Sequence, residues 1–172
     1  MGIILPRRGA WISCAALALL AAAPVQASDG TSTGRAEISS GLTVVRIADL
    51  DFGTIIPSSA NGRVTINRNT GACTSQAGAT LVGSDCHRAE FLVTGMPSAS
   101  VSVGIDPAPI TLTRIGGGAT MAMDQLRVNA GPNKSIGAAG TLTFYAGGRL
   151  QVGGGQMPGV YEATFAVSVD YQ

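Results

Sequence analysis

Few side chains in this 172-residue chain are of the types that carry out chemistry. His87 is the only histidine, and it lies next to Cys86, with Asp85 and Glu90 close by. A nucleophilic triad needs a base that activates a serine or cysteine, and a zinc site needs three or four protein ligands. One histidine among scattered carboxylates supplies neither. We therefore predict no catalytic residue, no metal ligand and no cofactor.

Two other patterns have some features of binding sites. Asp49 and Asp51 in the stretch ADLDFG would share one face of a strand, but the stretch lacks the glycine turn and the distal glutamate of a calcium loop. The glycine-rich stretches lack the Lys-Ser/Thr pair and the following helix of a phosphate-binding loop. The sequence thus predicts a protein that is not an enzyme.

The first residues are typical of an export signal. Arg7 and Arg8 precede the apolar run Ala10–Ala23, and small residues follow at Val25–Ala27. This run is shorter than the ~20 apolar residues that a membrane-spanning helix needs. We predict that residues 1–27 are a signal peptide, that no transmembrane segment remains after its removal, and that the protein resides in the periplasm, at the cell surface or outside the cell.

Net charge limits the classes of binding partner, and the cysteine content predicts a disulfide. Beyond residue 27 the chain has nine basic and ten acidic residues, so nothing favours binding to nucleic acid. Cys73 and Cys86 are the two cysteines in that part, and an even pair in an oxidising compartment predicts one disulfide. In the loop-entropy model such a bond contributes about 3 kcal/mol.

The rest of the chain has the pattern of short strands with turn residues between them. Strands are predicted at residues 42–48, 52–56, 63–67, 79–82, 88–94, 100–105, 110–114, 121–128, 141–145, 150–152 and 160–171. The glycine clusters IGGGAT, YAGGRL and VGGGQM are predicted to be loops. This spacing predicts the all-β class, as an antiparallel, immunoglobulin-like β-sandwich. Residues 28–35 would be a flexible leader, and residues 36–172 a single domain.

Two stretches alternate most regularly. In VYEATFAVSVDYQ every second residue is apolar, which is typical of a half-buried strand; these residues are Tyr161, Ala163, Phe165, Val167, Val169 and Tyr171. Behind the leader, a second stretch sets one face with Ala36, Ile38, Ser40, Leu42 and Val44. Two interpretations of the second stretch stay open: it is the first strand of its own domain, or residues 36–47 are a donor strand for another molecule.

Three stretches resemble a known family. ADLDFGTIIP, at residues 48–57, and GTLTFYAGGRLQVGGGQMPGVYEATFAVSVDYQ, at residues 140–172, resemble the opening and closing motifs of the bacterial secreted family called domain of unknown function 4402. AEFLVTGMPSASVSV between them resembles that family's strand-turn-strand. The chain departs from the family at Ala163, where glycine is common, at Gly155, where asparagine is frequent, and in the insertion that carries the two cysteines. The resemblance implies a secreted β-domain with no known activity.

The C-terminal run also resembles the subunits of pili that the periplasmic chaperone and outer-membrane usher assemble. Those subunits end in an alternating strand with an aromatic penultimate residue, here Tyr171, and a glycine fourteenth from the end, here Gly159. The resemblance implies a sandwich that lacks one strand, which a chaperone and then a neighbouring subunit's N-terminal arm supply. It implies a strand-exchange edge at Gly159, Tyr161, Phe165, Val167, Val169 and Tyr171, and a donor face at Ala36, Ile38, Leu42 and Val44.

Two functions are consistent with these patterns. In the first, the protein is an exported, non-enzymatic surface protein, a pilin-like subunit that forms homo-oligomers or fibres by β-strand complementation. In the second, it is a self-contained, monomeric extracellular β-sandwich whose glycine-rich loops bind polysaccharide or another surface component. The two differ in whether the strand at residues 42–48 belongs to its own domain.

Overall fold

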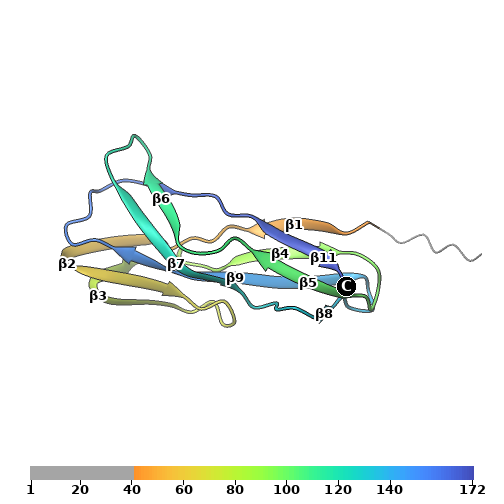
Figure 1. Ribbon diagram of the computed structural model, residues 1–172. Coiled ribbons are helices and arrows are strands. Elements are labelled where there is room, and N and C mark those ends of the chain that lie inside the picture. Colours follow the sequence, from red (N-terminus) through yellow and green to blue (C-terminus); the bar gives the residue numbers. More distant parts are fainter. Residues whose placement is uncertain (1–40) are drawn as a thin grey trace, which may run out of the picture. The chain divides into compact units, whose positions relative to one another are not determined.

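The structure is a computed structural model that describes residues 41–172 (Figure 1). The predicted all-β class is confirmed, and no helix in the described residues is long and apolar enough to cross a membrane. The predicted signal peptide and leader, and the donor residues Ala36 and Ile38, lie outside the described residues. The strands are β1 (Thr43–Ala48), β2 (Thr54–Ile66), β3 (Cys73–Val82), β4 (Ala89–Thr94), β5 (Ser100–Ile105), β6 (Ile110–Arg114), β7 (Thr120–Val128), β8 (Lys134–Ser135), β9 (Thr141–Val152), β10 (Tyr161–Glu162) and β11 (Val167–Tyr171).

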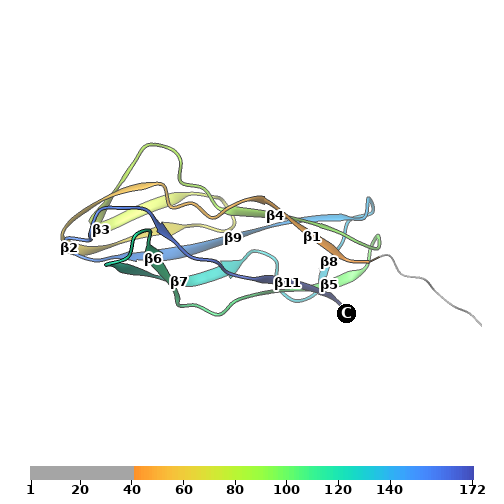
Figure 2. The same cartoon turned by 90° about the horizontal axis from the view of Figure 1, so that it is seen from above.

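These strands form two antiparallel sheets, which confirms the predicted β-sandwich. The larger sheet has the order β1-β4-β9-β7-β6-β10, with β2 paired to both β9 and β3, and the smaller sheet has the order β11-β5-β8. β9 is the central strand: β4 and then β2 pair along one of its edges, and β7 pairs along the other. Its long path through the domain is visible in Figures 1 and 2.

The core consists of two hydrophobic clusters. The first lies on the part of the larger sheet made by β2, β6, β7 and β9, and includes Val64 and Leu150. The second lies between the two sheets, and includes Val93, Val101 and Phe144. In the second cluster the rings of Phe91 and Phe144 stack with their centroids 5.2 Å apart. Apolar side chains at alternate strand positions thus supply the burial that stabilises the fold.

The C-terminal run differs from its prediction as one strand over residues 160–171. β10 pairs with β6 in the larger sheet, and β11 pairs with β5 in the smaller sheet. The segment Ala163–Ala166 between them belongs to no strand, because the chain passes there from one sheet to the other. Ala163, which the alternation predicts to point inward, is exposed in this passage. The alternation resumes at Phe165, which is half-buried and meets Phe91 edge-on, with the ring centroids 6.5 Å apart.

The prediction of a loop at YAGGRL is wrong, because this stretch lies within β9. A Cβ atom on Gly147 would lie 2.4 Å from the carbonyl oxygen of Ile66, so glycine is needed for the close approach of another backbone. The predicted strands at residues 52–56 and 63–67 form one strand, β2, whose register shifts between Pro57 and Gly62. The loops predicted at IGGGAT and VGGGQM are confirmed.

The predicted disulfide is confirmed. Cys73 and Cys86 are bonded with an S–S distance of 1.99 Å. The bond links the first residue of β3 to the segment that precedes β4. It therefore closes the excursion that the chain makes between these two strands.

Candidate functional site

A groove of about 1020 Å³ opens between two segments of the chain, one between Asp49 and Pro57 and the other between Gln156 and Phe165. The first segment connects β1 to β2, and the second leads into β11. The floor of the groove is apolar, with side chains of Leu112, Met121, Met123, Leu150 and Val152. All of these except Met121 are buried residues of the first core cluster. The groove therefore reaches the hydrophobic core.

The core-facing side of β1, the strand that leads into the first of these segments, is exposed, although no β1 residue lines the groove. Val44 pairs with Val93 and Arg46 pairs with Phe91, and directly paired residues of antiparallel strands point to the same face. Val93 is 0% exposed and Phe91 is 8% exposed, whereas Val44 is 37% exposed. The side chain of Arg46 is 66% exposed and forms an ion pair of 2.7 Å with Asp49. β1 thus presents core-facing positions to solvent.

Two strands, β1 and β11, each have one unpaired edge among the described residues. Among the described strands, β1 pairs only with β4, and β11 pairs only with β5. Figures 1 and 2 both show β1 and β11 in the same half of the domain, running in opposite directions, and Figure 2 shows the two strands apart, β1 beside β4 and β11 beside β5. Val167 and Val169 of β11 contact the second core cluster and remain half-buried. Each of these two strands therefore has a second edge that no described strand covers.

Gly159 fixes one wall of the groove. Its φ angle of 150° is one that residues with a side chain rarely adopt, and a Cβ atom there would lie 2.5 Å from Nε of Arg114. Nε of Arg114 donates a hydrogen bond of 2.7 Å to the carbonyl of Pro158, and Nη1 donates one of 3.1 Å to the carbonyl of Gly117. Arg114 thus ties the wall to the β6–β7 hairpin. The resemblance to pilus subunits singled out Gly159 but not its partner Arg114.

The two tyrosines of the C-terminal run hold its ends. Tyr161 donates a hydrogen bond of 2.6 Å to the carbonyl of Met157 and accepts one of 2.7 Å from the amide of Gln156. The hydroxyl of Tyr171 accepts a hydrogen bond of 2.7 Å from the backbone N–H of Met96, in the turn after β4. A Cβ atom on Gly95 would lie 2.6 Å from that hydroxyl, so this contact needs glycine at position 95.

The predicted strand-exchange residues do not share one strand. Gly159, Tyr161 and Phe165 line the groove, whereas Val167, Val169 and Tyr171 lie on β11. The predicted donor residues Leu42 and Val44 lie in their own domain, since Leu42 packs on the second core cluster and Val44 belongs to β1. Of the two open interpretations, the structure thus places residues 43–48 in the first strand of their own sheet. This is the placement expected of a self-contained sandwich, so strand exchange would depend on the second, unpaired edge of β1 or on detachment of β1 from β4.

The remaining polar candidates serve local turns. His87 and Asp51 exchange backbone hydrogen bonds of 2.8 and 3.0 Å, and Nδ1 of His87 lies 2.5 Å from the carbonyl oxygen of Asp85. The carboxylate of Asp51 accepts a hydrogen bond of 2.7 Å from the N–H of Gly53. Within residues 41–172, no three His, Cys, Asp or Glu side chains are grouped so that they could hold a metal ion.

One comparison with known proteins finds a match. Residues 42–171 match the model of the family described as "Domain of unknown function (DUF4402)". No curated protein and no solved structure matches the chain. The matched region runs from the start of β1 to the end of β11, so both walls and the floor of the groove lie within it.

Proposed function

Since the chain belongs to the DUF4402 family, whose function is unknown, we propose a function from the groove. The protein is an exported, non-enzymatic structural protein of the cell surface, a pilin-like subunit that a β-strand from another chain completes. The observation that carries this proposal is the 37% exposure of Val44, which points the same way as the fully buried Val93 beside it.

The physics of strand addition supports this proposal. An added strand would form main-chain hydrogen bonds with an uncovered edge, while alternate side chains would enter the apolar groove. Four apolar side chains buried there would contribute on the order of 5 to 10 kcal/mol before the costs of association. An uncovered apolar edge is also an aggregation hazard, which natural proteins avoid by covering it. A permanent partner strand would remove that hazard.

The nature of the donor follows from the residues it can offer. Before Gly41, the predicted donor face has only Ala36 and Ile38 as apolar side chains. A second copy of the chain offers Leu42 and Val44 as well only if its β1 detaches from its own β4. Donation from copy to copy is heterologous and does not close, so it produces a filament. A periplasmic chaperone would supply the strand before assembly, and an outer-membrane usher would take part in the assembly.

The export part of the proposal has separate support. The disulfide between Cys73 and Cys86 is of the kind that forms and persists in oxidising compartments. The predicted signal peptide at residues 1–27 would deliver the chain to the periplasm, and from there to the cell surface or the medium.

The test is a binding experiment with the chain that begins at Ser28. A synthetic peptide spanning Arg35–Ile47 is added, and the melting temperature and the size-exclusion profile are measured. We expect a saturable rise in melting temperature and the release of monomers from any oligomer. The control is the same peptide with Ile38→Asp and Leu42→Asp, which should not bind. A monomeric chain that binds neither peptide would contradict strand exchange by this segment, and would favour the self-contained binding module.

A further inference from the structure

A second cavity, of about 820 Å³, lies where β6 and β7 diverge. The last pair of that ladder is Ile110 with Met123. Beyond this pair the chain before β6 belongs to the smaller sheet through β5, whereas β7 continues in the larger sheet to Val128. The cavity is lined by the turn Asp106–Pro109 on one side and by β7 on the other. It shares no lining residue with the groove between residues 49–57 and 156–165.

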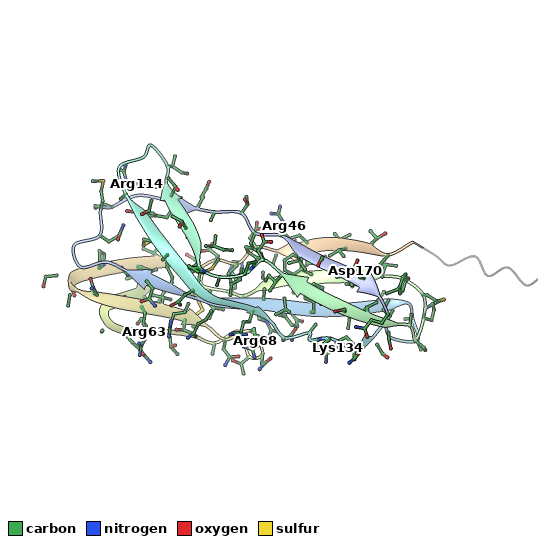
Figure 3. All side chains as sticks on the ribbon, viewed as in Figure 1. Arg46, Arg63, Arg68, Arg114, Lys134 and Asp170 are labelled. Carbon is green, nitrogen blue, oxygen red and sulfur yellow. A yellow bond between two sulfur atoms is a disulfide. The ribbon has the colours of Figure 1, made fainter. Side chains whose placement is uncertain are left out.

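Two arginines from distant parts of the sequence line this cavity. Arg127 of β7 pairs with Gly147 of β9, and a Cβ atom on Gly147 would lie 2.7 Å from the backbone nitrogen of Arg68. Because Gly147 has no side chain, the backbone at Arg68 can lie close to β9, next to the position where Arg127 pairs, and both arginines line the cavity. Within residues 41–172, neither guanidinium has a hydrogen bond or an ion pair. In Figure 3, Arg68 lies on the same side of the domain as Arg63, opposite Arg46.

The loop that carries Arg68 is held in place. Arg88 donates hydrogen bonds to the carbonyl of Arg68, at 3.1 Å, and to the carbonyl of Asn69, while its Cζ atom lies 3.4 Å from the ring centroid of Tyr145. The side chain of Asn67 accepts hydrogen bonds from the N–H groups of Asn69 and Thr70. A charged group on such a fixed loop loses little conformational freedom when it binds a ligand.

The carboxylates of the cavity already have partners. Asp124 accepts two hydrogen bonds of 2.7 Å from Arg149 and one of 2.9 Å from Gln151. Asp106 accepts a hydrogen bond of 2.7 Å from the backbone N–H of Ala166. Arg149 neutralises Asp124. The charges of the cavity that no ion pair in the described residues compensates are therefore the two guanidinium groups of Arg68 and Arg127 and the one carboxylate of Asp106.

We propose that this cavity binds an acidic saccharide, a uronic-acid glycan, whose carboxylate Arg68 and Arg127 hold. Planar guanidinium groups bind carboxylates with two parallel hydrogen bonds. The amide oxygen of Gln125 accepts hydrogen bonds from Arg149, which leaves its N–H groups to donate to sugar hydroxyls. Gln151 donates one N–H to Asp124, which leaves its other N–H and its oxygen for such hydroxyls. The rings of Pro107, Pro109 and Pro132 provide apolar surface for the C–H face of a sugar ring.

A local distortion of β7 supports this assignment. Gln125 has a φ angle of 54°, in the left-handed region that residues with side chains seldom adopt, and it lies where the register between β7 and β9 shifts. Such a bulge re-aims side chains and is common next to binding sites. It places an exposed amide at the edge of the cavity, between Asp124 and Arg127. The inference does not depend on strand complementation.

The test is calorimetric titration of the oxidised chain beginning at Ser28 with trigalacturonic acid, its methyl ester and inorganic phosphate. We expect the acid to bind, and Arg68→Gln and Arg127→Gln each to weaken its binding by about tenfold or more, equivalent to about 1.4 kcal/mol. The control is Arg63→Gln, an arginine on the same side that Gln76 holds at 2.7 Å, outside the cavity; it should bind like the parent.

Several results would overturn the proposal. Equal binding of the acid and its methyl ester would mean that the carboxylate is not recognised. Phosphate that displaces the acid at equal concentration would indicate a general anion site. If a glutamine variant melts at a lower temperature, Arg68→Lys and Arg127→Lys replace it, since they keep the charge and lose the planar fork; unchanged affinity in both lysine variants would refute bidentate binding.

Discussion

Val44 and Val93 provide a matched test of whether the sandwich is open. They lie opposite each other on β1 and β4 and point to the same face, but only Val44 is exposed. Shortening valine to alanine removes about two methylene equivalents, worth about 1.6 kcal/mol of transfer free energy when fully buried. With the cavity that remains, Val93→Ala should lower the free energy of unfolding by about 2 to 3 kcal/mol. At 37% exposure and with no enclosed cavity, Val44→Ala should cost about 1 kcal/mol or less.

The two costs should converge once an added strand covers the exposed face of β1. Denaturant unfolding of the chain beginning at Ser28 is measured for both variants, with and without saturating peptide Arg35–Ile47. In its presence we expect Val44→Ala to cost nearly as much as Val93→Ala, so that the variant binds the peptide about tenfold more weakly. Equal costs without any peptide would show that the face of Val44 is already covered in the free protein. That result would refute the uncovered face of β1.

Three further predictions concern stability and are measured by denaturant unfolding. Replacing both Cys73 and Cys86 with serine should lower the free energy of unfolding by about 3 kcal/mol in the loop-entropy model. Hydrogen bonds from its partner Arg149 hold the pKa of Asp124 below its usual value of 3.8, so its contribution is present above about pH 4 and is lost as the pH falls through the lowered pKa. Asp124→Asn should therefore destabilise the protein at pH 7, and this effect should shrink progressively as the pH is lowered below 3.8. Gly147→Ala should cost about 2 kcal/mol or more because its Cβ atom would meet backbone, whereas Gly131→Ala, with nothing within 4 Å, should be close to neutral.

The local sequence pattern correctly predicted strands whose neighbouring strands do not alter their length or their pairing. The bounds predicted for residues 100–105 and 110–114 agree with β5 and β6. The C-terminal run was predicted as one strand because alternation reports an extended backbone and not its neighbour. Phe165 keeps the phase of Tyr161 and Val167 while the chain changes sheets. Sequence thus predicted which side chains point inward, and long-range pairing decided which sheet received them.

Glycine clusters show a similar limit. IGGGAT forms the tip of the β6–β7 hairpin, where positive φ angles at Gly116 and its two successors require glycine. YAGGRL has the same composition but lies in a central strand, because the backbone from Ile66 to Arg68 passes over Gly147. No local signal separates these two uses of glycine, and the same close approach creates the meeting of Arg68 with Arg127. The second cavity was therefore beyond reach of sequence analysis.

One residue in the sequence indicates the uncovered face of β1. The alternation that sets Leu42 and Val44 on one face continues to Arg46, and the structure confirms that Arg46 faces the same way as the buried Phe91. An arginine in the core-facing phase would be costly to bury without a partner, so it indicates that this end of the face is not covered by the chain's own core. Alternation alone reports which way a side chain points. The polarity of the next residue on the same face, here Arg46, indicates whether that face is covered by the core. Here it indicates a face of β1 that the described residues leave uncovered.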